Sequence, residues 1–253
     1  MLWQLIHRDI RSRFVGSATG WLWLLVTPLL LLAVYGFVFG LVFRARVPDG
    51  LEMPFVAWLA VALWPWLAFS EGVLRGGQAI RQHSALISRV ALPRSLLVIA
   101  SVSSSFALHL IGYATVLLAL SLFVGVDIHW SAIGGVLLVM ATLFVFSLGL
   151  GLALAALQVY IRDLEQFVPT LFLFWFFMTP IIYSPELLPA AMSRWMAINP
   201  MSLWVDQIRA GLLHGQLFPA PIELFQLFTY GAIALGIGWF LFRRLSPFFE
   251  DFL

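Results

Sequence analysis

Residues 130–161 read WSAIGGVLLVMATLFVFSLGLGLALAALQVYI and contain no charged side chain. About 20 consecutive apolar residues form a helix long enough to cross a bilayer, and this run exceeds that length. Further uncharged runs occupy residues 14–43, 53–70, 95–126, 166–185 and 224–242. The sequence therefore predicts an all-α integral membrane protein with six transmembrane helices, at roughly residues 21–43, 54–74, 97–124, 132–158, 165–184 and 222–242.

The composition supports this class and excludes several kinds of chemistry. Of the 253 residues, 62% are hydrophobic and only 10% are charged, whereas a soluble domain of this size carries far more surface charge. All 14 basic residues are arginines, so the chain has neither a P-loop lysine for nucleotide phosphates nor a Schiff-base lysine. It has no cysteine, which excludes disulfides and thiolate metal sites. If the function uses ATP, another chain must hydrolyse it.

The positions of the arginines predict the orientation in the membrane. Loops on the cytoplasmic side of a membrane carry an excess of Lys and Arg. One side of the predicted topology holds most of the arginines, namely Arg8, Arg11, Arg13, Arg75, Arg81, Arg89, Arg94, Arg162, Arg243 and Arg244. The other side holds only Arg44, Arg46, Arg194 and Arg209. We therefore expect both termini of this multi-pass protein to be cytoplasmic.

Three segments outside the spans have amphipathic patterns within a single transmembrane domain that covers residues 1–253. Residues 1–14 suggest a helix lying in the cytoplasmic interface, with a frayed leader as the alternative. We expect Gly76 and Gly77 to end the second span, and residues 76–93 form either a short amphipathic helix or a solvated basic loop. Residues 185–221 are too polar to span and too apolar for a free loop, which predicts short re-entrant helices at the outer interface.

Two local patterns concern helix packing and helix capping. Ser147, Gly151 and Ala155 recur every four residues in the fourth predicted span, a spacing that lets helix backbones approach closely. This stripe fits either packing within the chain or a dimer interface. Asp163, with Gln166 three residues later, resembles a capping box at the start of the fifth span, so we expect the Asp163 carboxylate to cap that helix.

No constellation for catalysis or metal binding is present in the sequence. The five histidines show no metal-ligand spacing, and only His109 lies deep in a predicted span. An ionisable group inside a membrane is a functional candidate, but we expect a neutral His109 bonded to a helix backbone. Glu71 has Arg75 four residues on as a helical ion-pair partner, and no span contains a pair of buried carboxylates. These features disfavour both an enzyme and an ion-coupled carrier.

Aromatic residues gather around a helix break in FWFFMTPIIYSPELLP, residues 174–189. A helix interior tolerates proline poorly, so the span is expected to end near Pro180 at the outer face. Aromatic faces can stack on the C–H faces of sugar rings. We predict that Trp175, Phe176 or Tyr183 faces a central pathway between two subunits. The alternative for these residues is contact with lipid or packing in the core.

Several stretches together resemble the type-2 ABC transporter permeases that export polysaccharides. Residues 11–40, RSRFVGSATGWLWLLVTPLLLLAVYGFVFG, are similar to the N-terminal signature of that family, with Gly20, Trp23 and Pro28 in the positions of its Gly–x–x–Trp and Pro. LWPWLAFSEGVLRGGQAIRQHSALISRVALPR resembles its second span and coupling loop. VYIRDLEQFVPTLFLFWFFMTPIIYSPELLP, followed by INPM and DQIRAGLL, resembles its fifth span and outer region, although the Ser-Pro usual in the family is Thr179-Pro180 here.

The resemblance implies a homodimer of permeases that assembles with two cytoplasmic ATPase subunits. ATP and Mg would bind to the ATPase subunits, and no nucleic-acid partner is expected. The cargo it implies is a lipid-linked polysaccharide, of the O-antigen, capsule or teichoic acid kind, that crosses the bacterial inner membrane. By the same resemblance, residues 76–93 contain the segment that couples to the ATPase, with Arg81, His83, Ser84, Leu86, Ile87 and Arg89. The implied conduit comprises Trp23, Tyr35, Phe172, Trp175, Phe176 and Tyr183, and the outer gate comprises Pro180, Pro185, Trp195 and Trp204. Arg8, Arg11 and Arg13 are candidates for contact with the lipid headgroup, or else simply mark the topology.

Two other functions compete with polysaccharide export. The same scaffold could export a drug or a small lipid, although the dense aromatic residues and the outer re-entrant segment disfavour this. A membrane-embedded glycan-processing enzyme is the alternative from another class, and the missing acidic or metal site argues against it.

Overall fold

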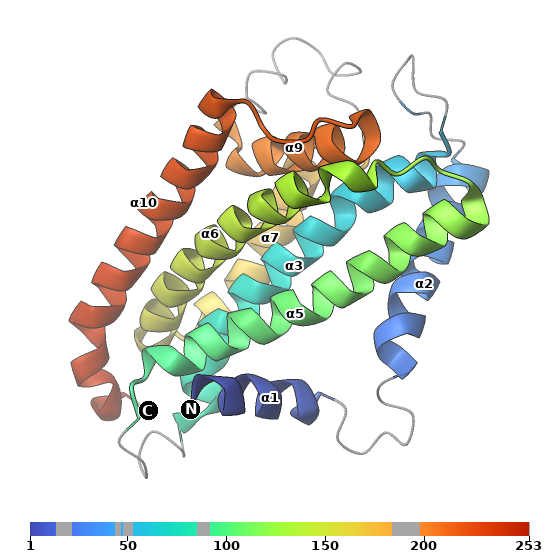
Figure 1. The fold of residues 1–253 in the computed structure, drawn as a ribbon. Coiled ribbons are helices and arrows are strands. Elements are labelled where there is room, and N and C mark those ends of the chain that lie inside the picture. Colours follow the sequence, from blue (N-terminus) through green and yellow to red (C-terminus); the bar gives the residue numbers. More distant parts are fainter. Residues whose placement is uncertain (14–21, 44–46, 48–52, 85–91, 184–197, 253) are drawn as a thin grey trace.

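The computed structural model describes residues 1–13, 22–43, 47, 53–84, 92–183 and 198–252. These residues form helices and no β-strand, which confirms the predicted all-α class. The long helices run side by side as a tilted bundle (Figure 1), while α1 lies across one end of the bundle and α9 across the other. Both termini lie at the α1 end.

Among the described residues, five segments are long and apolar enough to cross a membrane. They are α2 with a π-helical extension (Trp23–Tyr35 and Gly36–Val42), α3 (Phe55–Gln82), α5 with a π-helical extension (Ser95–Ala119 and Leu120–Val124), α6 (Ile133–Tyr160, after the 3-10 turn Trp130–Ala132) and α10 (Pro221–Leu245, before the 3-10 turn Ser246–Asp251). The shorter helices are α1 (Leu2–Ser12), α7 (Leu164–Met178) and α9 (Pro200–His214).

The fifth predicted span is shorter than expected. Helix α7 has 15 residues and ends at Met178, so at 1.5 Å per residue it is about 22 Å long, against a hydrocarbon core of about 30 Å. The helix ends there because Thr179, which precedes Pro180, is extended with φ −102° and ψ 137°, as the residue before a proline prefers. The presence of six spans therefore remains a prediction.

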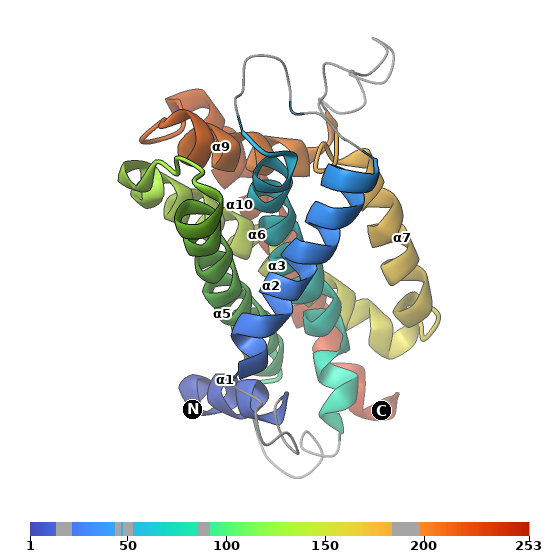
Figure 2. The same ribbon diagram turned by 90° about the vertical axis from the view of Figure 1, so that its right-hand side faces the viewer.

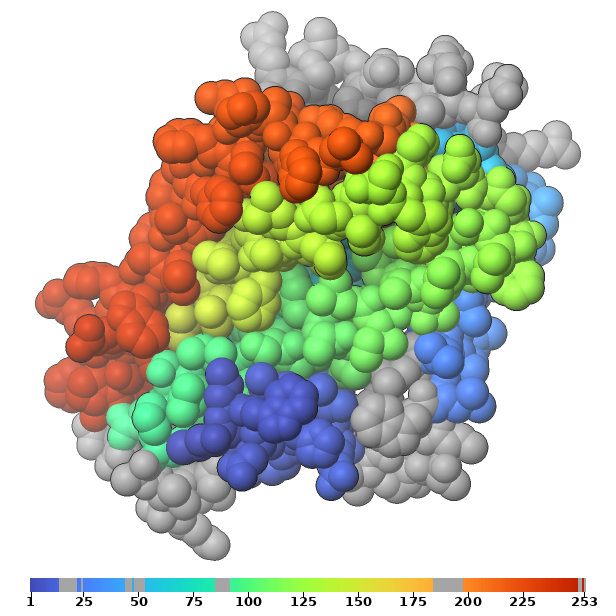
Figure 3. Space-filling view, in the orientation of Figure 1, coloured from blue at the N-terminus to red at the C-terminus, as the bar shows by residue number. Residues whose placement is uncertain are grey.

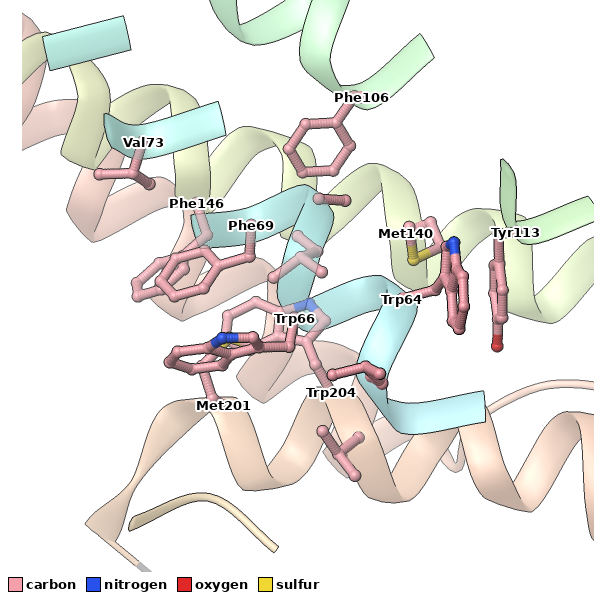
Figure 4. Packing of buried hydrophobic residues seen from close by; sticks show 14 of the residues in the cluster. Trp64, Trp66, Phe69, Val73, Phe106, Tyr113, Met140, Phe146, Met201 and Trp204 are labelled. Carbon is pink, nitrogen blue, oxygen red and sulfur yellow. The ribbon is translucent and has the colours of Figure 1, made fainter. Parts of the chain in front are cut away.

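Helix α3 forms the centre of the bundle and packs against α5 on one side and α6 on another. Its residues are buried on nearly every face, including Trp58, Trp64 and Trp66, which are at most 4% exposed. Figure 4 shows Trp66 and Phe69 of α3 beside Phe146 of α6 and Trp204 of α9. A helix that is apolar all round belongs in the interior of a large protein or membrane bundle, and α3 occupies that place.

The prediction that Gly76 and Gly77 end the second span is wrong, because α3 continues through both glycines to Gln82. Each glycine is instead a site of close packing. A Cβ atom at Gly76 would lie 2.8 Å from Cγ2 of Val102, and one at Gly77 would lie 2.6 Å from Cδ2 of Leu154. The glycines therefore let α3 approach α5 and α6 closely.

The stripe of Ser147, Gly151 and Ala155 is buried within the chain, which decides between the two alternatives in favour of intramolecular packing. Gly151 faces Val102 and Gly76 at the crossing of α3 and α6. On another face of α6, a Cβ atom at Gly238 of α10 would collide with the Gly149 carbonyl. Without a hydrophobic force between helices in lipid, such close backbone contact is a main source of stability.

The expected cap at the start of α7 does not form through the side chain. Asp163 is the N-cap residue, but its carboxylate makes no capping hydrogen bond. The Asp163 carbonyl instead accepts hydrogen bonds from the backbone N–H groups of Gln166 and Phe167, at 3.1 and 3.0 Å. The location of the helix start was right and the capping mechanism was wrong.

Gly238→Ala should lower the stability of the protein by ~1–3 kcal/mol, because overpacking at a close helix crossing forces the backbones apart. Gly236→Ala is the matched control, since a Cβ atom at Gly236 meets nothing within 4 Å and alanine favours the helix. The apparent midpoint of thermal unfolding in detergent measures both effects. Equal midpoints for the two variants would contradict the close α6–α10 crossing.

Candidate functional site

A group of polar side chains joins α1 to the bundle. We name it the polar joint, and it consists of Asp9 and Arg13 from α1 and its C-cap, Glu71 and Arg75 from α3, and Ser104, Ser105 and His109 from α5. The joint therefore fixes where α1 lies on the end of the bundle (Figure 1).

Arg13 connects all three helices of the polar joint. Its Nη1 donates to Oε1 of Glu71 at 2.6 Å. Its Nη2 donates to the hydroxyl oxygens of Ser105 at 2.8 Å and of Ser104 at 3.2 Å. On the α1 side, Asp9 accepts from Nη2 of Arg75 at 3.2 Å and from the Ser104 hydroxyl. Each of these charges has an opposite partner, as removal from water requires.

Glu71 also binds the one histidine that lies deep in a predicted span. Oε2 of Glu71 lies 2.8 Å from Nε2 of His109, and Nε of Arg75 lies 3.9 Å from Oε1. The Glu71–Arg75 pairing expected from sequence is confirmed. The prediction that His109 bonds to a helix backbone is wrong, because the crossing of α3 and α5 places a carboxylate opposite the imidazole.

An open groove of about 260 Å³ begins at the polar joint. Arg13, Glu71 and His109 form its polar end, and the rest of its lining is largely apolar. The other lining residues are Trp23, Thr27, Pro28 and Leu31 of α2, Trp64 and Leu67 of α3, and Leu108 and Gly112 of α5. The groove thus offers one charged end and one hydrocarbon-like end. Such a lining suits an amphiphile.

The N-terminal arginines therefore divide into two kinds. Arg8 and Arg11 of α1 have exposed side chains, and neither has an ion pair within the described part of the chain. Arg13, in contrast, is held by Glu71 and Asp9. Contact with a lipid headgroup remains a prediction for all three, and only Arg8 and Arg11 are freely accessible in this structure.

The aromatic residues of α7 occupy two opposite faces. Phe172 is 7% exposed and packs on Trp66 and Phe69 of α3, so its side chain does not reach a pathway on the surface of this chain. Trp175 and Phe176 are half-buried on the same side and also contact Trp66. The exposed face carries a different set, Phe167, Phe174 and Phe177, at 60%, 64% and 54%.

The other predicted conduit residues lie apart from this cluster. Trp23 is 49% exposed and lines the groove at the polar joint. Tyr35 is half-buried and stacks on Phe39 at 5.9 Å between ring centroids. The Tyr183 hydroxyl donates to the Phe177 carbonyl at 2.7 Å. The structure of one chain therefore brings Phe172, Trp175 and Phe176 together around Trp66 and leaves the other three predicted conduit residues apart from them.

Two polar side chains hold the helix break after α7 and form what we name the clamp, Asn199 and Arg209. The Asn199 side chain accepts from Nε1 of Trp175 at 2.8 Å and donates to the Thr179 hydroxyl at 2.9 Å. Arg209 of α9 is 6% exposed, and its two Nη atoms donate to the carbonyls of Pro180 at 2.7 Å and Ile181 at 3.0 Å.

The Arg209 guanidinium also stacks over the Trp58 ring, 3.4 Å from the centroid, which joins α9 to α3. Burial lowers the pKa of Arg209 to about 9, so the side chain remains charged at neutral pH. From the arginine distribution alone, Arg209 is only one of the few arginines on the predicted outer side. Its position as a lone charge within IRAGLL was the signal for a buried role.

The predicted outer-gate residues fall into two groups. Pro180 lies in the turn held by the clamp. Trp204 is fully buried, donates from Nε1 to the Thr142 hydroxyl at 3.0 Å and stacks on Phe146, so it forms part of the core rather than a movable surface. Pro185 and Trp195 lie outside the described residues.

The segment predicted to couple to an ATPase is only partly described. Arg81, in the last turn of α3, forms an ion pair with Glu165 at the start of α7. Nδ1 of His83 lies 2.9 Å from the Ala79 carbonyl, and Ser84 follows it. Leu86, Ile87 and Arg89 lie outside the described residues. The Arg81–Glu165 pair links the ends of two helices where this segment begins.

Arg13→Gln should lower stability by ~1–3 kcal/mol, because it leaves the part-buried Glu71 carboxylate without its nearest cation. The double variant Arg13→Gln/Glu71→Gln should recover part of this loss, since no uncompensated charge remains. Thermal midpoints of the two single variants and the double variant give the coupling energy. Arg11→Gln, which removes an exposed arginine from the same helix, should change little. Strict additivity of the two substitutions would contradict the proposed joint.

Arg209→Lys should destabilise the protein by ~1–3 kcal/mol although it keeps the charge, because an ammonium cannot reproduce the forked hydrogen bonds and ring stacking of a guanidinium. Arg162→Lys, at an exposed position, is the control. Limited proteolysis near residues 179–183 provides a second measurement, and faster cleavage is expected in Arg209→Lys alone. Unchanged stability and cleavage would contradict the clamp.

Comparison with known proteins identifies the family of this chain. Residues 1–213 match the ABC-2 type transporter family. The chain is 32% identical to the O-antigen export system permease protein RfbA of Myxococcus xanthus, over 99% of this chain and 94% of that protein. It is 25% identical to the protein of the same name from Klebsiella pneumoniae, over 98% and 93%, and 24% identical to the polysialic acid transport protein KpsM of Escherichia coli, over 94% and 91%. This multi-pass membrane protein belongs to the ABC-2 type transporter family.

Proposed function

We propose that the chain is the permease subunit of an ATP-driven exporter that moves lipid-linked O-antigen-type polysaccharide from the cytoplasm to the periplasm. The observation that carries this proposal is similarity over nearly the whole chain to O-antigen export permeases from two organisms. The helical bundle and the long apolar segments fit a permease that sits in the inner membrane. Both termini lie at the same end of the bundle, and the arginine distribution favours the cytoplasmic side for that end.

The energy for transport would come from a separate ATPase. This chain has no lysine for a P-loop, so ATP and Mg would bind to two partner subunits rather than to this chain. We propose that residues 76–93 contact the ATPase. Helix α3 is continuous from Phe55 to Gln82 and is tied to α7 by Arg81–Glu165 and to α1 by the polar joint. A displacement at its end would therefore reach both helices.

The pathway for the glycan would form between two copies of the chain. Figure 2 shows α2 across the front of the bundle and α7 along its side. Both helices present large exposed apolar faces, with Leu25, Leu30 and Val34 on α2, Phe37 on its π-helical extension, and Phe167, Phe174 and Phe177 on α7. The exposed aromatic residues support stacking on sugar rings better than the buried Phe172 does. Trp175 and Phe176 could contribute only through their half-exposed edges.

The lipid end of the cargo would meet the α1 end of the chain. Arg8 and Arg11 are exposed there, and guanidinium groups bind phosphate oxygens in a forked geometry. The groove that begins at the polar joint offers apolar surface next to Arg13.

A capsular polysaccharide is the second candidate cargo. The observation in its favour is the 24% identity to a polysialic acid transport protein over 94% of this chain. Teichoic acid, a drug or a small lipid has no comparable support.

Loss of the chain from its native cell should abolish surface polysaccharide while lipid-linked glycan accumulates on the inner side of the membrane. Comparison of intact cells with lysed spheroplasts measures the two pools. If the cargo is of the O-antigen type, the glycan ladder on lipopolysaccharide disappears and any capsule remains. Normal surface glycan of both kinds without the chain would overturn the proposed function.

Arg81→Glu/Arg89→Glu should reduce export and glycan-stimulated ATP hydrolysis at least tenfold while the chain still inserts into the membrane, because opposite charges would face the ATPase. Since Arg81 also pairs with Glu165, the swap Arg81→Glu/Glu165→Arg, made together with Arg89→Glu, is the control that retains an internal ion pair. Loss of export in the charge reversal with normal export in the swap would assign the Arg81 effect to the internal pair. Intact export in both would show that the coupling assignment is wrong.

A further inference from the structure

A groove of about 490 Å³ runs along the outer face of α10, near the C-terminal end of that helix. Gly236, Trp239, Phe240, Arg243 and Arg244 line it. These positions follow one another at helical spacing, so they form one stripe on the helix. Figure 3 shows α10, in red, along the edge of the molecule, and Figure 1 shows that α1 and the C-terminal end of α10 lie at the same end of the bundle.

The opposite face of α10 is fixed to the bundle. Gly238 packs against Gly149 of α6, and Phe242 is buried and contacts the completely buried Phe249. Arg94 donates to the Ser246 carbonyl and lies 5.9 Å from the Phe249 ring, and the Tyr160 hydroxyl donates to the Leu245 carbonyl at 2.9 Å. These contacts hold the stripe in one orientation, pointing away from the bundle.

The charges in the groove have no partner in the described part of the chain. Arg243 and Arg244 are both exposed, and neither makes an ion pair or a side-chain hydrogen bond with another described residue. Both arginines lie in the last turn of α10, where the partial negative charge of the helix C-terminus is about half an elementary charge. It therefore offsets only part of the two positive charges, and two adjacent cations attract an anion. Their complement is a ligand with a phosphate group.

The apolar part of the groove specifies the rest of the ligand. Trp239 and Phe240 are 42% and 59% exposed and stand next to Gly236, where a Cβ atom would meet nothing within 4 Å. Gly236 precedes Arg243 by about 10 Å along the helix axis. When the arginines lie at headgroup level, the open space beside Gly236, which we call the notch, therefore lies inside the hydrocarbon region. Aromatic side chains commonly line this boundary.

We propose that this groove binds an anionic glycerophospholipid of the leaflet that faces α1. The lipid phosphate lies against Arg243 and Arg244, and one acyl chain runs past Trp239 and Phe240 into the notch at Gly236. The site lies on α10, whereas the groove at the polar joint lies between α2, α3 and α5. It is therefore a separate lipid site, and it does not depend on which cargo the protein exports.

The full-length protein in nanodiscs of phosphatidylethanolamine with a minority of phosphatidylglycerol tests the proposal. Native mass spectrometry after transfer to detergent measures how much phosphatidylglycerol stays bound. Arg243→Gln/Arg244→Gln should reduce retention about tenfold or more, because basic side chains near an anionic surface act additively. Arg243→Lys/Arg244→Lys should keep most of it. Arg162→Gln removes an exposed arginine elsewhere. It is the control for the single variants Arg243→Gln and Arg244→Gln, and the phosphatidylglycerol retained by the three variants is compared.

Gly236→Leu separates a shaped groove from charge alone. It keeps both arginines, and its Cβ atom would meet nothing within 4 Å, so it should reduce retention severalfold while the thermal midpoint does not fall. The proposal would be overturned if Arg162→Gln lost as much phosphatidylglycerol as Arg243→Gln or Arg244→Gln. Full retention of phosphatidylglycerol in Gly236→Leu would also overturn it.

A second copy of the chain is the competing occupant of this face. Because the chain has no native cysteine, Trp239→Cys provides a single reactive thiol for crosslinking in the membrane. Efficient crosslinking between two copies through residue 239 would assign the groove to a protein interface and overturn the proposal. Absence of such crosslinks, with lipid retained by the wild-type protein, supports it.

Discussion

The ion pair between Arg13 and Glu71 is the contact on which the arrangement of the α1 end depends. A charge placed among apolar helices is tolerated only with an opposite charge and hydrogen bonds around it. Glu71 satisfies this condition with partners from two other elements, Arg13 and His109. An amphipathic helix could otherwise lie anywhere in the interface plane. The pair gives α1 a single position relative to α3 and α5, and it also forms one end of the groove.

At the other end of the bundle, the buried charge is that of Arg209, and its partners are backbone carbonyls instead of carboxylates. The break after α7 frees carbonyl groups that no helix can satisfy. Arg209 and Asn199 bind these groups from the α9 side, and the Trp58 ring covers the guanidinium. The helix break that proline imposes thereby becomes a binding surface for α9. Both ends of α3 are thus attached to a helix that lies across the bundle, α1 at one end and α9 at the other.

Sequence reasoning succeeded where a single physical variable decides the result. Run length and charge placed the long apolar helices, because the bilayer thickness sets the length that a span requires. It failed where the result depends on which neighbour faces a residue. Gly76 and Gly77 resemble a helix end in isolation, yet they mark close contacts with Val102 and Leu154. Phe172 and Phe174 have equal hydropathy, and only the packing of α7 on α3 separates the buried ring from the exposed one. The sequence could not predict that His109 pairs with Glu71, because the pairing depends on how α3 and α5 cross.

The unequal burial of the helices has a consequence for how sequences in this family can diverge. Most positions on α3 are surrounded by protein, so a substitution there must preserve volume and shape as well as apolar character. On α10 the outward residues such as Ile222, Phe225 and Ile233 touch no other part of the described chain closely enough to be buried. Any apolar residue meets the requirement for lipid contact there. Two permeases of this kind can therefore differ widely at these outward positions of α10 while the side-chain volumes along α3 remain nearly fixed.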